Sequence, residues 1–224
     1  MSETSPPASA TPATPARRFR MPDEIGVIVA LVVLMIFIGV ARPRFLNPLN
    51  LLTLLGHTTF LGMLAVGMVF LLAIREIDLS VGSMFNLSAV VTALLMVAGV
   101  NPWLAAFIGI LFGALLGLFN GALAVILRLP AIIVTLGTYS MFQGLSLVVD
   151  NCRAVVPQDQ TSSFFTFASA KIGKIMPVTG AVFLVLAIAM HYVLHRTRFG
   201  YRVQAVGSNP EAAALAGISN ATVR

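Results

Sequence analysis

The sequence predicts an all-α polytopic membrane protein with about six transmembrane helices. Of its 224 residues, 58% are hydrophobic and only 10% are charged, whereas a soluble domain carries about 25% charged residues. A helix needs about 20 residues to cross the hydrocarbon core, and lipid offers no hydrogen bonds to an open backbone, so each apolar stretch is expected to be helical. The six stretches are residues 25–41, 51–74, 84–100, 103–127, 131–149 and 175–194.

The chain is expected to divide into three regions. Residues 1–20 are rich in Pro, Ala, Ser and Thr and end in arginines, so they cannot bury enough apolar surface to fold and form a disordered, basic-ended cytoplasmic tail. A cleaved signal peptide is the alternative, but the first apolar stretch is long and Pro43 follows the small residues 39–41 closely. Residues 21–195 form the transmembrane domain, and residues 196–224 form a cytoplasmic segment.

A cytoplasmic N-terminus satisfies the positive-inside rule. Nine basic residues then lie on the cytoplasmic side and five on the outer side. The net charge of +6 therefore indicates the anionic cytoplasmic leaflet, that is membrane lipid, as a partner. Nucleic acid is not expected, because the basic residues stand singly with no aromatic platform among them.

Residues 75–83 interrupt the apolar pattern with two carboxylates, Glu76 and Asp78. A charged residue at a helix centre costs about 2.5 to 3.5 kcal/mol on insertion scales, so a helix break is expected here. Asp78 or Ser80 could cap the following helix, and Gly82 permits a kink. Two interpretations stay open: a half-helix break beside a translocation path, or a plain cytoplasmic turn.

Glycines recur at every fourth position in the fourth apolar stretch. This spacing lines one face of a helix with hydrogen atoms, so another backbone can approach closely. Asn120 stands beside the series, and a hydrogen bond across helices is favoured over a substrate contact for it. The predicted packing glycines are Gly109, Gly113, Gly117 and Gly121.

The fifth stretch is unusually polar for a lipid-facing span. Pro130 fits the first turn of its helix, and Thr135, Thr138 and Gln143 follow within it. Such uncharged donors and acceptors suit a lumen that passes sugars, although interhelical hydrogen bonding is an equal alternative. The predicted pathway or gate residues are Glu76, Asp78, Ser80, Asn120, Thr135, Thr138 and Gln143.

A short cytoplasmic helix is predicted near the end of the chain. Asn209 suits the N-cap and Pro210 the first helical position, Glu211 complements the helix dipole, and Gly217 supplies a left-handed stop. A helix that short is marginal alone and needs a partner surface.

Other chemistry is sparsely represented. His191 and His195 stand four apart without a carboxylate or cysteine, so no metal is expected. Cys152 is the single cysteine, which excludes an intrachain disulfide. No nucleophile elbow, phosphate-binding loop or HExxH pattern occurs. We therefore expect neither an enzyme nor a bound cofactor.

Three blocks together resemble the membrane permease family of bacterial ATP-binding-cassette importers for monosaccharides, the ribose, xylose and galactose type. The resemblance covers roughly residues 47–217. Ala131 stands where the family often has Phe, and Ser208 where it often has a second Gly. Members continue with several more helices, so the chain is expected to be the front part of a longer protein. The blocks are residues 76–82, residues 120–121 with 130–138, and residues 197–200 with 205–213.

The resemblance implies a multi-pass permease in the bacterial inner membrane. Two permease subunits, either two copies or a copy and a paralogue, form the pathway. A soluble binding protein delivers the monosaccharide, and a separate ATPase subunit drives transport. A nucleoside or a furanose-type signalling molecule is the alternative cargo, and an ATP-independent carrier or channel is less favoured. The family's ATPase-coupling helix matches Asn209, Pro210, Glu211, Ala212, Ala213 and Gly217, and the Asp78 block matches a break near the pathway.

Overall fold

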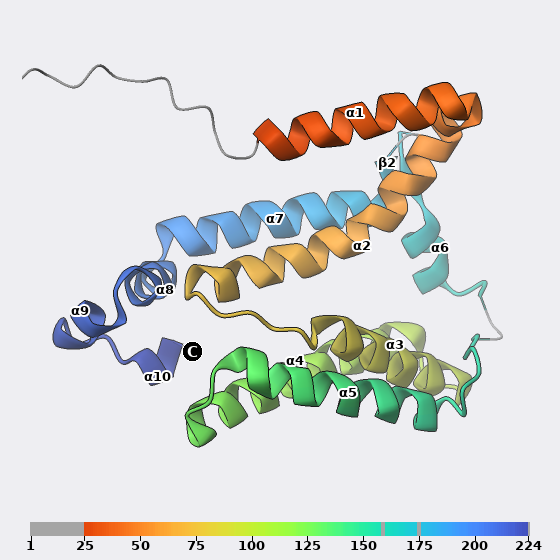
Figure 1. Cartoon of the computed structure of the whole chain (residues 1–224). Helices are drawn as coiled ribbons and strands as arrows, with labels where there is room; N and C mark the ends of the chain where they lie inside the picture. Colours follow the sequence, from red (N-terminus) through yellow and green to blue (C-terminus); the bar gives the residue numbers. More distant parts are fainter. Residues whose placement is uncertain (1–24, 158–159, 174–175, 224) are drawn as a thin grey trace, which may run out of the picture. The chain divides into compact units, whose positions relative to one another are not determined.

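A computed structural model describes residues 25–157, 160–173 and 176–223, so the predicted tail at residues 1–20 lies outside the described residues. The described chain is almost entirely helical, with one short antiparallel hairpin (Figure 1). The helices are α1 (Ile25–Ala41), the 3-10 helix η1 (Pro43–Leu46), α2 (Pro48–Ala73), α3 (Val81–Val97), α4 (Pro102–Leu127), α5 (Ala131–Val149), α6 (Ser163–Ser169), α7 (Val178–Arg196), α8 (Arg198–Ser208), α9 (Pro210–Leu215) and α10 (Asn220–Val223). The hairpin pairs β1 (Lys171–Ile172) with β2 (Met176–Pro177).

The predicted all-α polytopic fold class is confirmed. Among the described residues, four helices (α2, α4, α5 and α7) are long and apolar enough to cross a membrane. The apolar helices α1 and α3 are shorter, at 17 residues each. The predicted stretch 84–100 is shifted, because α3 begins three residues earlier, directly after the helix break.

The described residues divide into two compact units, one up to residue 50 and one from residue 51 on. In the first unit α1 packs on η1, and a Cβ added at Gly39 would lie 2.7 Å from Leu46 Cδ1. In the second unit α3, α4 and α5 pack against one another as a three-helix bundle (Figure 1). Asn86 Nδ2 of α3 donates to Ser146 Oγ of α5 at 2.9 Å inside this bundle.

Three glycines of the series on α4, Gly109, Gly113 and Gly117, face α3. A Cβ at Gly113 would lie 3.1 Å from Ser88 Oγ, and a Cβ at Gly109 would collide with the hydroxyl of Thr92. A Cβ at Gly117 would lie 3.7 Å from the Met84 methyl group. The contacted residues 84, 88 and 92 are themselves four apart, so the antiparallel helices match turn by turn. Small residues thus allow the two backbones to approach closely.

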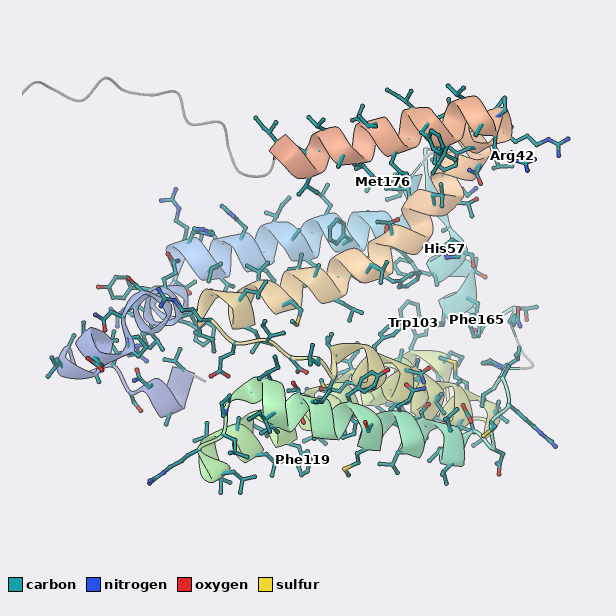
Figure 2. The ribbon with its side chains drawn as sticks, viewed as in Figure 1. Arg42, His57, Trp103, Phe119, Phe165 and Met176 are labelled. Atoms are coloured by element: carbon teal, nitrogen blue, oxygen red, sulfur yellow. The ribbon has the colours of Figure 1, made fainter. Side chains whose placement is uncertain are left out.

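An aromatic cluster joins α6 to the start of α4 (Figure 2). The ring of Trp103 lies edge-on to Phe164 at 5.2 Å and tilted against Phe167 at 5.5 Å. Trp103 Nε1 also donates to Ser163 Oγ at 3.0 Å. Such a ring with an apolar body and a polar handle is typical of a membrane–water interface.

We expect Gly109→Ala to destabilise the bundle by roughly 1 to 3 kcal/mol, as for other overpacked interiors. The new methyl group would collide with the Thr92 hydroxyl, which donates to the Ser88 carbonyl at 2.8 Å. Gly144→Ala on α5 is the matched control, because nothing lies within 4 Å of its added Cβ. Unfolding midpoints in detergent compare the two, and equal midpoints would contradict the close approach.

Candidate functional site

The chain leaves helical geometry between α2 and α3, at residues 74–80. The Arg75 backbone has a left-handed φ of 62°, and the Glu76 N–H donates back to the Leu71 carbonyl at 2.9 Å. This arrangement closes the carboxyl end of α2. The predicted break at residues 75–83 is therefore present but shorter, because Gly82 already lies inside α3.

Asp78 holds the break by folding its side chain over the following turn. Its Oδ1 atom accepts both the Ser80 backbone N–H and the Ser80 hydroxyl, each at 2.7 Å. Ser80 occupies the N-cap position of α3, but its side chain makes no capping bond. Of the two residues expected to cap α3, Asp78 is therefore the one whose side chain accepts a backbone N–H at this end of the helix.

Two helices of the bundle hold the break from outside. Asn120 Nδ2 of α4 donates to Ser80 Oγ at 2.7 Å. The Leu79 backbone N–H donates to Thr135 Oγ1 of α5 at 3.1 Å. Ser80 is fully buried, and Asn120 and Thr135 are nearly so. The break therefore has polar partners on two neighbouring helices, Thr135 at a backbone N–H and Asn120 at a side chain.

A cavity of about 360 Å³ opens beside the break. Four of the predicted pathway residues line it: Glu76, Asp78, Asn120 and Thr135. Its other walls come from α2, from the start of α3 and from Gly117 and Gly121 of α4. We call this space the break cavity. Its remaining lining residues are Met63, Leu64, Gly67, Met68, Leu71, Val81, Met84, Ala124 and Ala131.

Three predicted pathway residues are not in the wall of the break cavity. Ser80 lies behind the wall, bonded to both Asp78 and Asn120. Thr138 is buried and its hydroxyl donates to the Thr135 carbonyl at 3.4 Å. Gln143 is half-buried and stands about two turns beyond Thr135 along α5.

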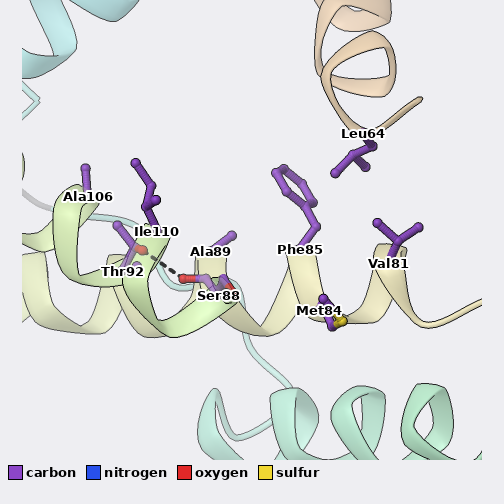
Figure 3. A pocket seen from close by; sticks show the side chains of 11 residues that line it. Leu64, Val81, Met84, Phe85, Ser88, Ala89, Thr92, Ala106 and Ile110 are labelled. Atoms are coloured by element: carbon purple, nitrogen blue, oxygen red, sulfur yellow. Dashed lines mark hydrogen bonds between the residues drawn. The ribbon is translucent and has the colours of Figure 1, made fainter. Parts of the chain in front are cut away.

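A second cavity, of about 380 Å³, lies between α3 and α4 (Figure 3). It shares Leu64, Val81 and Met84 with the break cavity. Its wall is almost entirely apolar, apart from the Ser88 and Thr92 side chains. The break cavity, with its four polar lining residues, therefore adjoins an almost entirely apolar cavity along the same helices.

The short helix α9 has the predicted caps. Asn209 Oδ1 accepts the backbone N–H groups of Glu211 and Ala212 at 3.0 Å each. Gly217, with φ of 82°, follows the end of the helix. Ala213 is buried, whereas Leu215 is 92% exposed. The helix therefore presents an exposed face that includes one large apolar side chain.

Sequence reasoning missed the contact between α8 and the end of α2. A Cβ added at Gly207 would overlap the Ala73 carbonyl oxygen. Arg75 Nη2 donates to the Ser208 carbonyl at 3.3 Å, and the rings of Phe70 and Phe199 stack 6.2 Å apart. A glycine seven residues after Gly200, on the same helical face, is the signal that could have indicated this close approach.

The chain matches known transport proteins. A family model described as branched-chain amino acid transport system / permease component matches residues 50–224. The ribose import permease protein of Bacillus subtilis is 34% identical over 90% of this chain and 62% of the relative. The L-arabinose ABC transporter permease protein of Azospirillum brasilense is 35% identical over 96% and 62%.

A third relative is the autoinducer 2 import system permease protein of Salmonella typhi, 29% identical over 90% of this chain and 57% of the relative. The chain thus spans about three fifths of the length of these curated relatives. No solved structure matches it.

We expect Ser80→Ala to destabilise the second unit by roughly 1 to 3 kcal/mol, the penalty for a buried polar group that loses its partner. The change removes the acceptor of Asn120 Nδ2 and one donor to Asp78. Thermal unfolding in detergent measures the effect, and Ser219→Ala at an exposed position is the control. A midpoint equal to that of the control would show that the hydrogen bonds at the break contribute little.

Proposed function

This chain belongs to the family of branched-chain amino acid transport system permease components, and from that premise we propose that it is the transmembrane permease subunit of an ATP-binding-cassette importer for a monosaccharide. The observation that carries the proposal is the break cavity, which gathers carboxylate, amide and hydroxyl groups at an interrupted helix. Interrupted helices with polar groups at membrane depth are typical of transporter binding sites.

A sugar suits the lining of the break cavity better than an amino acid does. The described residues that line it include no lysine or arginine to pair with a carboxylate. Its oxygen-bearing side chains can instead hydrogen-bond neutral hydroxyl groups. The relatives named for ribose and L-arabinose support the same class of cargo. A furanose-type signalling molecule is the second candidate for the cargo, because one relative is named for the import of autoinducer 2.

We assign ATP hydrolysis to a partner chain, because the sequence contains no phosphate-binding loop. We assign the contact with that ATPase to α9, whose exposed face includes Glu211, Ala212 and Leu215. Coupling requires that binding at one site changes the equilibrium at the other. The contact of Gly207 with Ala73, and of Ser208 with Arg75, offers a short physical link from α9 to the break.

The complete importer in this proposal has further partners. A soluble binding protein delivers the sugar, and a second copy or a related permease completes the pathway in the bacterial inner membrane. The N-terminus lies in the cytoplasm, which places residues 196–224 on the same side as the ATPase, as the positive-inside rule favours. The predicted tail at residues 1–20 and the transmembrane domain at residues 21–195 complete this organisation.

Uptake tests the proposal directly. Cells with and without the gene that encodes this chain are supplied with labelled D-ribose, L-arabinose, other pentoses and hexoses, and nucleosides. We expect loss of ATP-dependent uptake of one sugar when the gene, or that of the partner ATPase, is deleted. Uptake that persists without the ATPase would indicate a carrier or channel instead.

Gly207→Ala tests the coupling link. The added methyl group would collide with the Ala73 carbonyl oxygen and separate α8 from the end of α2. We expect substrate-stimulated ATPase activity of the reconstituted transporter to fall, within the roughly 5- to 150-fold range of allosteric couplings, while the protein stays in the membrane. Gly144→Ala is the control, since its Cβ meets nothing within 4 Å. Equal stimulation in both variants would remove the link from the mechanism.

A further inference from the structure

One residue that lines the break cavity carries a buried polar atom for which the structure shows no hydrogen-bond partner. Asn120 lines the cavity and is 4% exposed. Its Oδ1 atom is buried and accepts no hydrogen bond from the residues that the structure describes. Nearly all buried polar groups in proteins are paired, so an unpaired one calls for an explanation. At an interrupted helix beside a cavity, the natural explanation is a ligand.

The chemistry of its neighbours determines which end of the Asn120 amide faces the break. Asp78 Oδ1 accepts a backbone N–H, which can only donate, and it also accepts the Ser80 hydroxyl proton. With its own proton given to Asp78, the Ser80 oxygen is left as an acceptor. It therefore needs the amide NH₂ of Asn120, which lies 2.7 Å away. These hydrogen bonds, from Asp78 through Ser80 to the Asn120 amide NH₂, leave the amide oxygen of Asn120 without a partner among the described residues.

We propose that Asn120 Oδ1 is a specificity-determining acceptor, which takes a hydrogen bond from one hydroxyl group of the sugar as it passes through the break cavity. The inference rests on the proposed function. The class of ligand follows from the wall: the polar lining residues described are Glu76, Asp78, Asn120 and Thr135, with no basic side chain among them. A neutral polyol supplies the donor.

Met84 lies beside the Asn120 amide in the described state. Its sulfur lies 3.5 Å from Asn120 Nδ2 and 3.2 Å from Ser80 Oγ, and the residue lines both cavities. Methionine is unbranched and adapts to irregular gaps. A rotation of this one side chain can change the space beside the Asn120 amide without breaking the hydrogen bonds that Asp78 and Asn120 make with Ser80.

The test compares a transported sugar with its single-deoxy analogues. The complete transporter, with its ATPase and its binding protein in excess, is reconstituted in proteoliposomes and supplied with labelled D-ribose, L-arabinose and their deoxy forms. We expect the wild-type protein to reject one analogue, because a site built for a hydroxyl group disfavours a solute that lacks it. In Asn120→Leu the ratio of sugar to analogue uptake should fall roughly tenfold, the value of one such hydrogen bond. The binding protein's own preference is common to both variants and cancels from the comparison.

Two further variants separate this role from structural support. Asn86→Leu removes a different interhelical bond in the same bundle, to Ser146, and Asn86 does not line the break cavity. Its uptake ratio should match the wild type. Asn120→Ser keeps a hydroxyl group near Ser80 but removes the amide oxygen, so it should lose the discrimination even where the leucine variant folds poorly.

The outcomes separate the inference from its premise. If the wild-type protein transports none of the sugars in an ATP-dependent way, the proposed function fails and this inference fails with it. If transport occurs but Asn120→Leu or Asn120→Ser keeps the wild-type uptake ratio, only the assignment of the Asn120 oxygen is overturned. A wild-type protein that transports every deoxy analogue as fast as its parent sugar would overturn it equally.

Discussion

The hydrogen-bond chain from Asn120 through Ser80 to Asp78 is the interaction on which the candidate site depends. A helix that stops inside an apolar bundle exposes N–H and C=O groups that lipid cannot satisfy. Within the turn, the Asp78 carboxylate accepts the Ser80 N–H. Asn120 and Thr135 tie the turn to two other helices. Without these partners the segment between α2 and α3 would have either to continue as a helix or to move into water. Each alternative removes the break cavity.

The glycine series and the hydrogen-bond chain are two parts of the same arrangement. Asn120 reaches Ser80 only because α4 lies close against α3, and the glycines on α4 permit that approach turn by turn. The last contacted residue of α3, Met84, lies one helical turn beyond Ser80, and its sulfur lies 3.2 Å from Ser80 Oγ. Packing along the bundle therefore determines where the amide of Asn120 meets the break.

The sequence predicts what depends on local patterns. Apolar length indicates the helices, paired carboxylates indicate the break, and Asn209 before Pro210 indicates a capped helix, which its two backbone hydrogen bonds confirm. Contacts between distant segments are not accessible in this way. Leu79 bonds to Thr135, 56 residues away, and nothing in either segment specifies the other.

Helical geometry explains why one polar helix contributes only part of its polar residues to the cavity. Thr138, one turn from Thr135, satisfies its hydroxyl on its own helix, and Gln143 is about 12 Å further along than Thr135 at 1.5 Å per residue. A count of the hydroxyl and amide groups in α5 cannot distinguish these residues. Their positions along the helix axis determine which side chain reaches the break.

The position of α8 bears on the proposed coupling, because α8 brings the segment before α9 to the end of α2. Gly207 stands two residues before the N-cap of α9, and it contacts Ala73, the last residue of α2. Glu76, three residues further on, already lines the break cavity. A backbone contact through glycine has no flexible side chain to absorb a displacement. In the proposed coupling mechanism, a displacement of α9 passes through this contact to the end of α2, next to the segment that bears the carboxylates.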